Sequence, residues 1–411
     1  MKLHTKQLPF GWLTNLQTIP KLLLLSATLL LPLTFIFFCS NKSFLLLPYP
    51  SSSRIISDSN TSSSILEIDR ECDISRGEWV QDSDAPYYTN MTCWTIQEHQ
   101  NCIKYGRPDM GFLKWKWRPN GCELVHFDPT QFLEVVRGKS LAFVGDSLAR
   151  NQMQSLMCLL SKVEYPKDIS NATDENFKRM LYSSCNFTIS IFWSPFLVKS
   201  EDPNDQTTLW TLYLDEPDEA WSTKIDDLDY IIISDGNWFS RPSMFYENKK
   251  LVGCHFCQVP NVTDLTLHYS HRVAFRTALK AINRLPNFKG MVMLRTLSPS
   301  HFENGEWNNG GNCVRTKPFR GNETKMEEME FKLYRAQVEE FEKAKTEGLK
   351  RGLEFRMMDT TQAMLLRPDG HPSRYGHRAH ENVTLYNDCV HWCLPGPVDV
   401  WNDFLFHVLR L

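Results

Sequence analysis

Short apolar runs, each long enough for one buried strand, alternate with amphipathic stretches along most of the chain. Strand-type runs lie at residues 141–144, 230–233, 291–294 and 353–358. Helical periodicity marks residues 148–160, 271–285 and 325–351. A strand that is buried on both faces is continuously apolar, whereas a helix repeats every 3.6 residues. The alternation therefore predicts an α/β fold with a doubly wound, mostly parallel sheet.

Two stretches refine this expectation. The chain has no internal repeat. The amphipathic stretch 325–351 has an apolar stripe, which we interpret as core packing alone; it comprises Met329, Leu333, Val338, Phe341 and Ala344. The segment that contains Cys72, Cys93, Cys102 and Cys122 is rich in aromatic residues and has few periodic runs. It predicts a smaller, irregular lobe tied by disulfides.

An uncharged apolar run at residues 22–39 precedes these elements. Its length is near the lower limit for a membrane-spanning helix, and Lys2, Lys6 and Lys21 favour a cytosolic N-terminus. A cleaved signal peptide is the alternative, but the leading segment is long and no small-residue cleavage site follows. We expect a cytosolic tail at 1–21, a transmembrane signal anchor at 22–39, a flexible luminal stem at 40–70 and a luminal domain at 71–411.

Glycosylation motifs and cysteines support a secretory location for the part that follows residue 41. Eleven of the twelve cysteines lie in this part, and such cysteine usage suits an oxidising compartment. N-x-S/T motifs, each a candidate glycosylation site, occur at Asn60, Asn90, Asn171, Asn186, Asn261, Asn322 and Asn382.

Composition excludes several classes of protein. The chain has 411 residues, of which 42% are hydrophobic and 12% aromatic, so it can bury a core and is neither disordered nor collagenous. The net charge of −3 gives no electrostatic argument for nucleic-acid binding. The twelve tryptophans favour a ligand with flat faces, such as a sugar.

Ser147 is the first candidate for chemistry. It follows the strand 141–144 and begins the helix 148–160 in the segment GDSLARNQ. In open α/β sheets, functional groups lie just beyond the carboxyl ends of strands, and a helix N-terminus offers free N–H groups that can stabilise an oxyanion. On this motif alone, simple helix capping by Asp146 and Ser147 explains the residues equally well.

Asp388 and His391 supply what a serine nucleophile lacks. They stand three residues apart in the segment DCVHWCLPGP, and Cys389 and Cys393 flank them. A histidine can remove the serine proton, while an aspartate fixes its tautomer and stabilises the imidazolium. A structural histidine beside a solvated aspartate is the alternative. Together with Ser147, the pair favours a Ser–His–Asp triad.

These segments also carry a family resemblance. GDSLARNQ, RPDGHPS at residues 367–373 and DCVHWCLPGPVDVWN resemble the plant trichome birefringence-like polysaccharide O-acetyltransferases, within the GDSL/SGNH superfamily. The likeness extends from about Cys72 to the C-terminus. PYYTNMTCWTIQEHQNCIKYGRPD and SPSHFENGEW most resemble the branch that acetylates xyloglucan, with xylan acetyltransferases close by.

The resemblance implies a Golgi type II membrane protein with an SGNH-like luminal domain, two unequal lobes around a substrate cleft, and the triad Ser147, His391 and Asp388. It also implies the disulfides Cys72–Cys122, Cys93–Cys158, Cys102–Cys393 and Cys313–Cys389, although sequence alone cannot give connectivity. Cys185, Cys254 and Cys257 fall outside this set. A single CxxC is a weak metal signal, so a local disulfide or free thiols explain Cys254 and Cys257 better, and we predict no metal site.

The remaining site candidates are less specific. Ser147 N–H is the first oxyanion donor, and the superfamily places a Gly or Asn donor near Gly236 and Asn237, although many relatives carry Gly-His there. Arg150 and Asn151 follow the nucleophile and either bind substrate or brace loops. Four residues in family-like loops either line the cleft or pack the loops: His301, Trp307, Asp369 and His371.

The expected reaction passes an acetyl group through an acetyl-serine to a polysaccharide hydroxyl, with galactosyl side chains of xyloglucan as first choice. We expect no resident cofactor; acetyl-CoA or an acetylated carrier would serve as the donor co-substrate. Other Golgi acetylation proteins are possible partners, whereas nucleic acid is not. The alternatives are a xylan acetyltransferase, an acetylesterase with the same triad, and a non-catalytic binder of wall polysaccharides.

Overall fold

The computed structural model describes residues 73–170, 177–204, 207–378 and 386–411. The predicted tail, anchor and stem therefore lie outside the described residues, as do Cys72, Asn60, Asn171 and Asn382. Within the described ranges, no helix has both the length and the apolar character that a membrane span needs. Asn186, Asn261 and Asn322 are exposed, and Asn90 is partly exposed.

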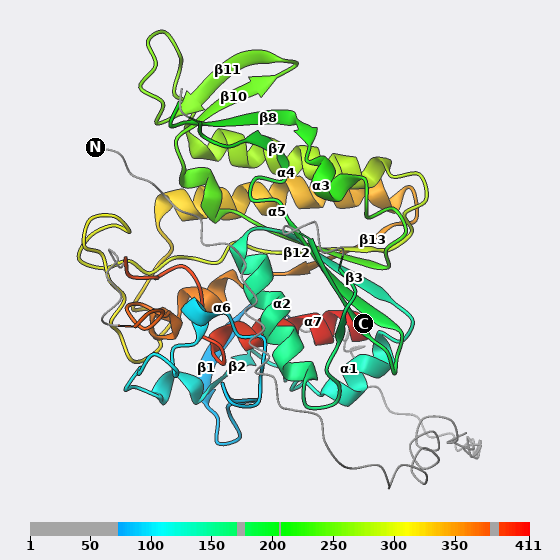
Figure 1. Cartoon of the computed structure of the whole chain (residues 1–411), viewed down its shortest axis with the longest axis vertical. Coiled ribbons are helices and arrows are strands. Elements are labelled where there is room, and N and C mark those ends of the chain that lie inside the picture. The colour runs from blue at the N-terminus through cyan, green and yellow to red at the C-terminus, as the bar shows by residue number, and fades with distance from the viewer. Residues whose placement is uncertain (1–72, 171–176, 205–206, 379–385) are drawn as a thin grey trace, which may run out of the picture. The chain divides into compact units, whose positions relative to one another are not determined.

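A seven-stranded sheet forms the centre of the unit Glu71–Leu411 (Figure 1). Its order is β13-β12-β9-β3-β6-β5-β4, and the five strands from β13 to β6 are parallel. The strands are β3 (Ser140–Gly145), β4 (Lys167–Asp168), β5 (Phe177–Tyr182), β6 (Phe187–Trp193), β9 (Tyr230–Ser234), β12 (Met291–Arg295) and β13 (Glu354–Met358). After β3 the chain first adds β4, β5 and β6 on one side of β3, and then adds β9, β12 and β13 on the other side. The strand order therefore reverses at β3. The predicted parallel α/β sheet is confirmed.

Helices cover both faces of this sheet, as its continuous apolar strands require. Alternate residues of β3 show why: Leu141 and Phe143 join one core, and Ala142 and Val144 join the other. α1 (Pro129–Val135), α2 (Ser147–Leu160) and α7 (Val400–Arg410) pack on the first face. α4 (Thr266–Arg284) and α5 (Glu328–Leu349) pack on the second, together with Trp221 of α3 (Glu219–Ser222).

The predicted stripe of α5 is wrong at two positions. Leu333, Phe341 and Ala344 are buried as expected, but Met329 is 38% exposed and Val338 is only partly buried. The buried face instead includes Ala336, Gln337 and Glu340. These positions keep the helical spacing of three and four residues. A stripe drawn from apolar residues alone could not include Gln337 and Glu340, because both are polar.

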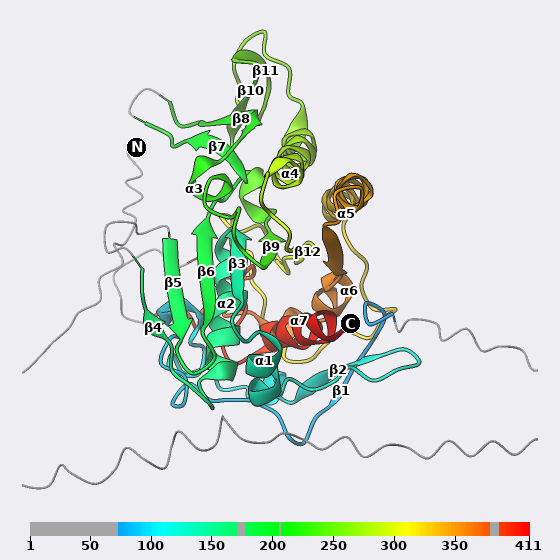
Figure 2. The ribbon, with the colours of Figure 1, turned by 90° about the vertical axis from the view of Figure 1, so that its right-hand side faces the viewer.

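A second sheet was not predicted at all. Its order is β11-β10-β8-β7, and only β8 and β10 are parallel. The strands are β7 (Val198–Glu201), β8 (Trp210–Pro217), β10 (Ser243–Glu247) and β11 (Lys250–His255). It lies at the top of Figure 2, beyond α3 and α4. Its strands mix polar and apolar residues because much of the sheet lies near the surface, so no continuous apolar run marked it.

The cysteine-rich segment that contains β1 (Gly77–Gln81) and β2 (Trp115–Pro119) lies at the bottom of Figure 2 and has little regular structure, as predicted. These two strands pair antiparallel. The Cys93–Cys158 disulfide links it to α2. Short helical turns complete the chain: η1 (Glu98–Gln100), η2 (Gly111–Leu113), η3 (Asn237–Ser240), α6 (Thr361–Leu365), η4 (Pro368–Gly370) and η5 (Pro397–Asp399).

Gly145 makes the sharp turn from β3 into α2. Its φ is +149°, and a Cβ atom there would lie 1.9 Å from the carbonyl oxygen of Ser234 on the neighbouring strand β9. Only glycine tolerates both the backbone angle and the contact. This turn places the start of α2 at the carboxyl end of the central strand, where the strand order reverses.

Gly145→Ala should lower the free energy of unfolding by about 3 kcal/mol or more, because backbone strain and a clash with β9 add together. Chemical denaturation followed by circular dichroism measures the change. Gly321→Ala is the matched control, since a Cβ there meets open space. Equal stability of the two variants would contradict this account of the turn.

Candidate active site

Ser147 is the first residue of α2 and is partly exposed. Asp146 precedes it as the N-cap, and its Oδ1 accepts a hydrogen bond from Leu148 N at 2.9 Å. The cap therefore belongs to Asp146 alone. Because the first helical N–H has no acceptor within its own helix, Ser147 presents both a hydroxyl and a backbone donor.

The structure brings the three predicted triad side chains together. Ser147 Oγ lies 2.6 Å from His391 Nε2, and His391 Nδ1 lies 2.8 Å from Asp388 Oδ2. The other carboxylate oxygen of Asp388 accepts the backbone N–H groups of Val390 and His391 at 3.1 and 2.9 Å. Asp388 thus fixes both the imidazole and the backbone turn that carries it.

The electrostatics suit a proton acceptor. Burial disfavours both charged forms and is the largest single effect on each pKa, but the opposing charges and hydrogen bonds together outweigh it. The negative charge of Asp388 raises the pKa of His391 above its ordinary value, and His391 holds the pKa of Asp388 far below its usual range. A histidine of raised pKa beside an ionised aspartate can accept a proton from Ser147 and hold it as an imidazolium.

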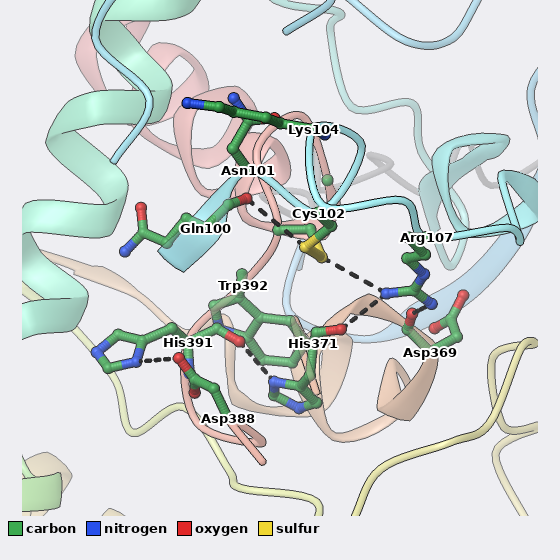
Figure 3. The surroundings of a disulfide bond; sticks show 12 residues. Gln100, Asn101, Cys102, Lys104, Arg107, Asp369, His371, Asp388, His391 and Trp392 are labelled. Atoms are coloured by element: carbon green, nitrogen blue, oxygen red, sulfur yellow. Dashed lines mark hydrogen bonds and ion pairs between the residues drawn. A yellow bond between two sulfur atoms is a disulfide. The ribbon is translucent and has the colours of Figure 1, made fainter. Parts of the chain in front are cut away.

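Disulfides hold the loop of residues 386–396 on both sides of His391. The pairs Cys313–Cys389 and Cys102–Cys393 are formed, and Figure 3 shows the second beside His391. Three of the four disulfides implied by the resemblance are therefore present, and the fourth involves Cys72, outside the described residues. Cys254 and Cys257 form a local disulfide, and Cys185 is a buried free thiol.

Asn151 braces this loop and does not face substrate, because it is fully buried. Its Oδ1 accepts the Trp392 N–H at 2.9 Å, and its Nδ2 donates to the Trp392 carbonyl and to Gln100 Oε1. Asn151 stands one turn along α2 from Ser147. One helix therefore positions both the candidate nucleophile and the loop that carries the candidate base.

His371 supports the loop from its other side. Its Nδ1 donates to the His391 carbonyl at 2.7 Å, its Nε2 shares a 2.7 Å hydrogen bond with His301 Nδ1, and its ring stacks on Trp392 with centroids 4.0 Å apart. Burial lowers the pKa of His371 and of His301. Arg107 Nη1 donates to the His371 carbonyl at 2.7 Å (Figure 3).

Asp369 and His301 are also buried, so they pack loops and do not line an open cleft. Asp369 forms an ion pair with Arg367, whose Nε lies 2.8 Å from its Oδ1. Only Trp307 among the four loop candidates is exposed, at 58%. The RPDGHPS segment therefore serves the site by holding the His391 loop.

Neither Gly236 nor Asn237 has a free backbone N–H for an oxyanion at Ser147, because both groups are already bonded. Gly236 N–H is bonded to Asp235 Oδ1 at 2.6 Å, and Asn237 N–H to Asp146 Oδ2 at 3.3 Å. Burial, followed by the neighbouring charge of Asp146, raises the pKa of Asp235 far above its ordinary value. The candidate oxyanion donors that these two bonds leave are Ser147 N–H and the side-chain amide of Asn237, a partly exposed residue.

Arg150 extends the site in another direction. Its guanidinium lies over the Trp193 ring, 4.5 Å from the centroid, and Trp193 in turn contacts Trp238 edge-to-face. Burial lowers the pKa of Arg150, while Asp146 opposes that shift. The positive charge of Arg150 is near enough to oppose protonation of His391.

Sequence reasoning missed His99. Its ring meets His391 edge-to-face with centroids 5.4 Å apart, and burial lowers its pKa to about 4. It therefore stays neutral beside the candidate base. Its position three residues before Cys102 was the available signal, since the Cys102–Cys393 pair brings this segment to the loop. Within the described part of the chain, no three His, Cys, Asp or Glu side chains are grouped to hold a metal ion.

Comparisons with known proteins show which family the chain resembles. Residues 124–408 match the "GDSL/SGNH-like Acyl-Esterase family found in Pmr5 and Cas1p", and residues 70–123 match the "PMR5 N terminal Domain". Protein trichome birefringence-like 19 of Arabidopsis thaliana is 58% identical over 88% of this chain and 85% of its own length. Xyloglucan O-acetyltransferase 4 of Populus trichocarpa is 44% identical over 83% and 81%. Xyloglucan O-acetyltransferase 2 of Arabidopsis thaliana is 41% identical over 88% of each chain.

Acylation of Ser147 by p-nitrophenyl acetate should slow as the pH falls through the pKa of His391, because protonation removes the base. The midpoint should lie above the free-imidazole value of about 6.5. In Asp388→Asn the charge that raises this pKa is absent, so the midpoint should move to lower pH and the rate should drop by about 10³- to 10⁴-fold. An unchanged midpoint would contradict the assigned electrostatics.

His371 offers a matched pair of substitutions. His371→Phe keeps a ring against Trp392 but removes the donor to the His391 carbonyl, whereas His371→Asn keeps a donor and removes the stack. The lost hydrogen bond should lower kcat for the small ester by about ten- to 100-fold with little change in KM. The Asn variant should retain more activity, and the reverse order would assign the effect to stacking.

Proposed function

The chain belongs to the GDSL/SGNH-like acyl-esterase family, among its trichome birefringence-like members, and from this premise we propose that it acetylates xyloglucan, most directly on galactosyl side chains. It is an acyltransferase, a polysaccharide O-acetyltransferase.

The acceptor proposal draws on relatives whose names state a substrate. The relatives at 44% and 41% identity are named xyloglucan O-acetyltransferases. The relative at 58% identity has a name that states no substrate. The segments PYYTNMTCWTIQEHQNCIKYGRPD and SPSHFENGEW, which resemble the xyloglucan branch, point in the same direction.

The observation that carries the mechanism is the hydrogen-bonded chain from Ser147 through His391 to Asp388. In the first step His391 Nε2 takes the Ser147 proton, and Ser147 Oγ attacks the acetyl carbonyl carbon of the donor. The oxyanion lies against Ser147 N–H, and the Asn237 side chain assists it. The bond to the leaving group then breaks, that group takes the proton from His391, and an acetyl-serine remains.

The second step uses the same residues in the opposite direction. His391 removes the proton of a sugar hydroxyl, whose oxygen attacks the acetyl-serine carbonyl. The Ser147 ester bond breaks, and Ser147 Oγ recovers the proton from His391. Asp388 stabilises the imidazolium in both steps and remains ionised, because its pKa is held low.

The donor and the location belong to the same proposal. The acetyl group would come from acetyl-CoA or an acetylated carrier, a co-substrate that leaves after the first step. The protein would lie in the Golgi membrane, held by the apolar run 22–39, with its catalytic domain in the lumen. The four described disulfides and the exposed candidate glycosylation sites support an oxidising lumen.

Ser147→Ala should abolish transfer from an acetyl donor to xyloglucan oligosaccharides, and intact mass spectrometry should find no acetyl-enzyme. The wild-type chain should gain one acetyl group on Ser147 when the acceptor is withheld. Ser83→Ala, which changes an exposed serine in the irregular segment, should match the wild type. An acetyl-transfer activity that survives Ser147→Ala would remove this serine from the nucleophile role.

A panel of xyloglucan, xylan and mannan oligosaccharides tests the acceptor. Mass gain on xyloglucan in preference to xylan and mannan is the expected result. Preference for xylan would assign the chain to that acceptor, and release of acetate with no mass gain on any oligosaccharide would make it an esterase. Binding without acetyl-enzyme formation would identify a non-catalytic polysaccharide binder.

A further inference from the structure

Two large aromatic side chains are exposed at the start of the loop 386–396, called the triad loop below, and on the loop that is bonded to it. Trp307 is 58% exposed and Tyr386 is 50% exposed. Their rings meet edge-to-face, with centroids 5.7 Å apart and planes at 61°. None of the triad contacts involves them. Adjacent exposed rings in a folded protein often mark a binding surface, and these two come from loops far apart in the sequence.

The loop that carries Trp307 is fixed to the triad loop at both of its ends. At its start, His301 N–H donates to the Cys389 carbonyl at 3.1 Å. At its end, Cys313 forms a disulfide with the same Cys389. Cys389 directly follows Asp388, so Trp307 belongs to a loop anchored beside the triad aspartate.

Further hydrogen bonds hold the loop between these anchors. Glu303 and Asn312 pair through two backbone hydrogen bonds of 2.7 and 2.8 Å, which close the loop at its base. Asn387 Nδ2 donates to the Gly311 carbonyl at 2.8 Å. Asn387 lies between Tyr386 and Asp388, so this contact fixes the segment of Tyr386 against the loop of Trp307. The two rings are thus held together by backbone structure as well as by their own contact.

Tyr386 lies close to the triad aspartate along the chain. Only Asn387 separates Tyr386 from Asp388, so the Cα atoms of Tyr386 and Asp388 lie within about 7 Å. From Asp388 the hydrogen-bonded chain runs 2.8 Å to His391 and then from His391 2.6 Å to Ser147. A polymer with one sugar at Ser147 would bring a neighbouring sugar into reach of the two rings.

We propose that Trp307 and Tyr386 form an acceptor subsite that binds a pyranose ring next to the sugar that receives the acetyl group. This inference rests on the proposed function, because it takes the acceptor to be a neutral polysaccharide. Such an acceptor offers no charge for an ion pair. Its rings present faces of C–H groups, which suit the electron-rich face of an aromatic ring, while Tyr Oη and Trp Nε1 can bond to hydroxyls.

The subsite predicts a defined kinetic pattern for Trp307→Ala and Tyr386→Ala in the full-length chain. Each should raise KM for xyloglucan oligosaccharides by about tenfold, which corresponds to about 1.4 kcal/mol of binding free energy. The burst of p-nitrophenol from p-nitrophenyl acetate should keep its rate, because this donor carries no sugar. Trp307→Phe should restore most of the acceptor affinity, and Tyr386→Phe should do the same.

Phe256→Ala is the matched control, since Phe256 is a 65% exposed aromatic residue just after the second sheet. It should leave both KM and the burst unchanged. Unchanged KM in the Trp307 and Tyr386 variants would overturn the proposal. A burst that slows in parallel with acceptor transfer would also overturn it, because the rings would then support the triad and not the acceptor.

Binding without chemistry separates this inference from the proposed function. In a Ser147→Ala background, xyloglucan and xylan oligosaccharides should quench tryptophan fluorescence, and Trp307→Ala or Tyr386→Ala should weaken that binding by about tenfold. If the wild type forms an acetyl-enzyme but transfers to no polysaccharide, the proposed function fails. If transfer occurs and neither ring affects KM or binding, only the subsite fails.

Discussion

The hydrogen bond between Ser147 and His391 joins residues that are 244 positions apart, and the rest of the site exists to keep that bond at 2.6 Å. Neither residue belongs to a segment that could hold the other by local structure. Ser147 is placed by a turn that only glycine allows, at the end of the central strand. His391 lies on a loop without regular structure, so its position depends on bonds to other parts of the chain.

Those bonds are two disulfides and the hydrogen bonds of two buried side chains. Two disulfides attach the loop to residues 102 and 313. Asn151 of α2 holds the Trp392 backbone, and His371 holds the His391 carbonyl. Buried polar groups are costly unless they are paired. Here the buried side chains of Asn151 and His371 both form hydrogen bonds with the backbone of the loop. The cost of burying these groups is therefore offset only when the loop has one particular conformation, which is the conformation that orients the imidazole.

The carboxyl side of the sheet adds an electrostatic constraint. Asp146 and Asp235 are both buried, and the positive charge of buried Arg295 partly opposes the rise in the pKa of Asp235. Their hydrogen bonds occupy the N–H groups of Leu148, Gly236 and Asn237. The same acids that shape the turn thereby restrict which donors remain for an oxyanion. The loop that carries Trp307 is also fixed by contacts to the His391 loop, because His301 N–H and Cys313 both bond to Cys389.

The sequence by itself determined the parallel sheet, because buried strands must be apolar throughout, and it identified Ser147, Asp388 and His391, because few residue types can perform this chemistry. It missed the second sheet, whose strands mix polar and apolar residues, and it missed the polar residues Gln337 and Glu340 on the buried face of α5. Only the tertiary structure decided that Asn151 and His371 brace the loop, that the backbone donors of Gly236 and Asn237 are already occupied, and that His99 meets the imidazole. Those roles depend on contacts between residues far apart in the chain, and no local pattern of polarity or spacing records such contacts.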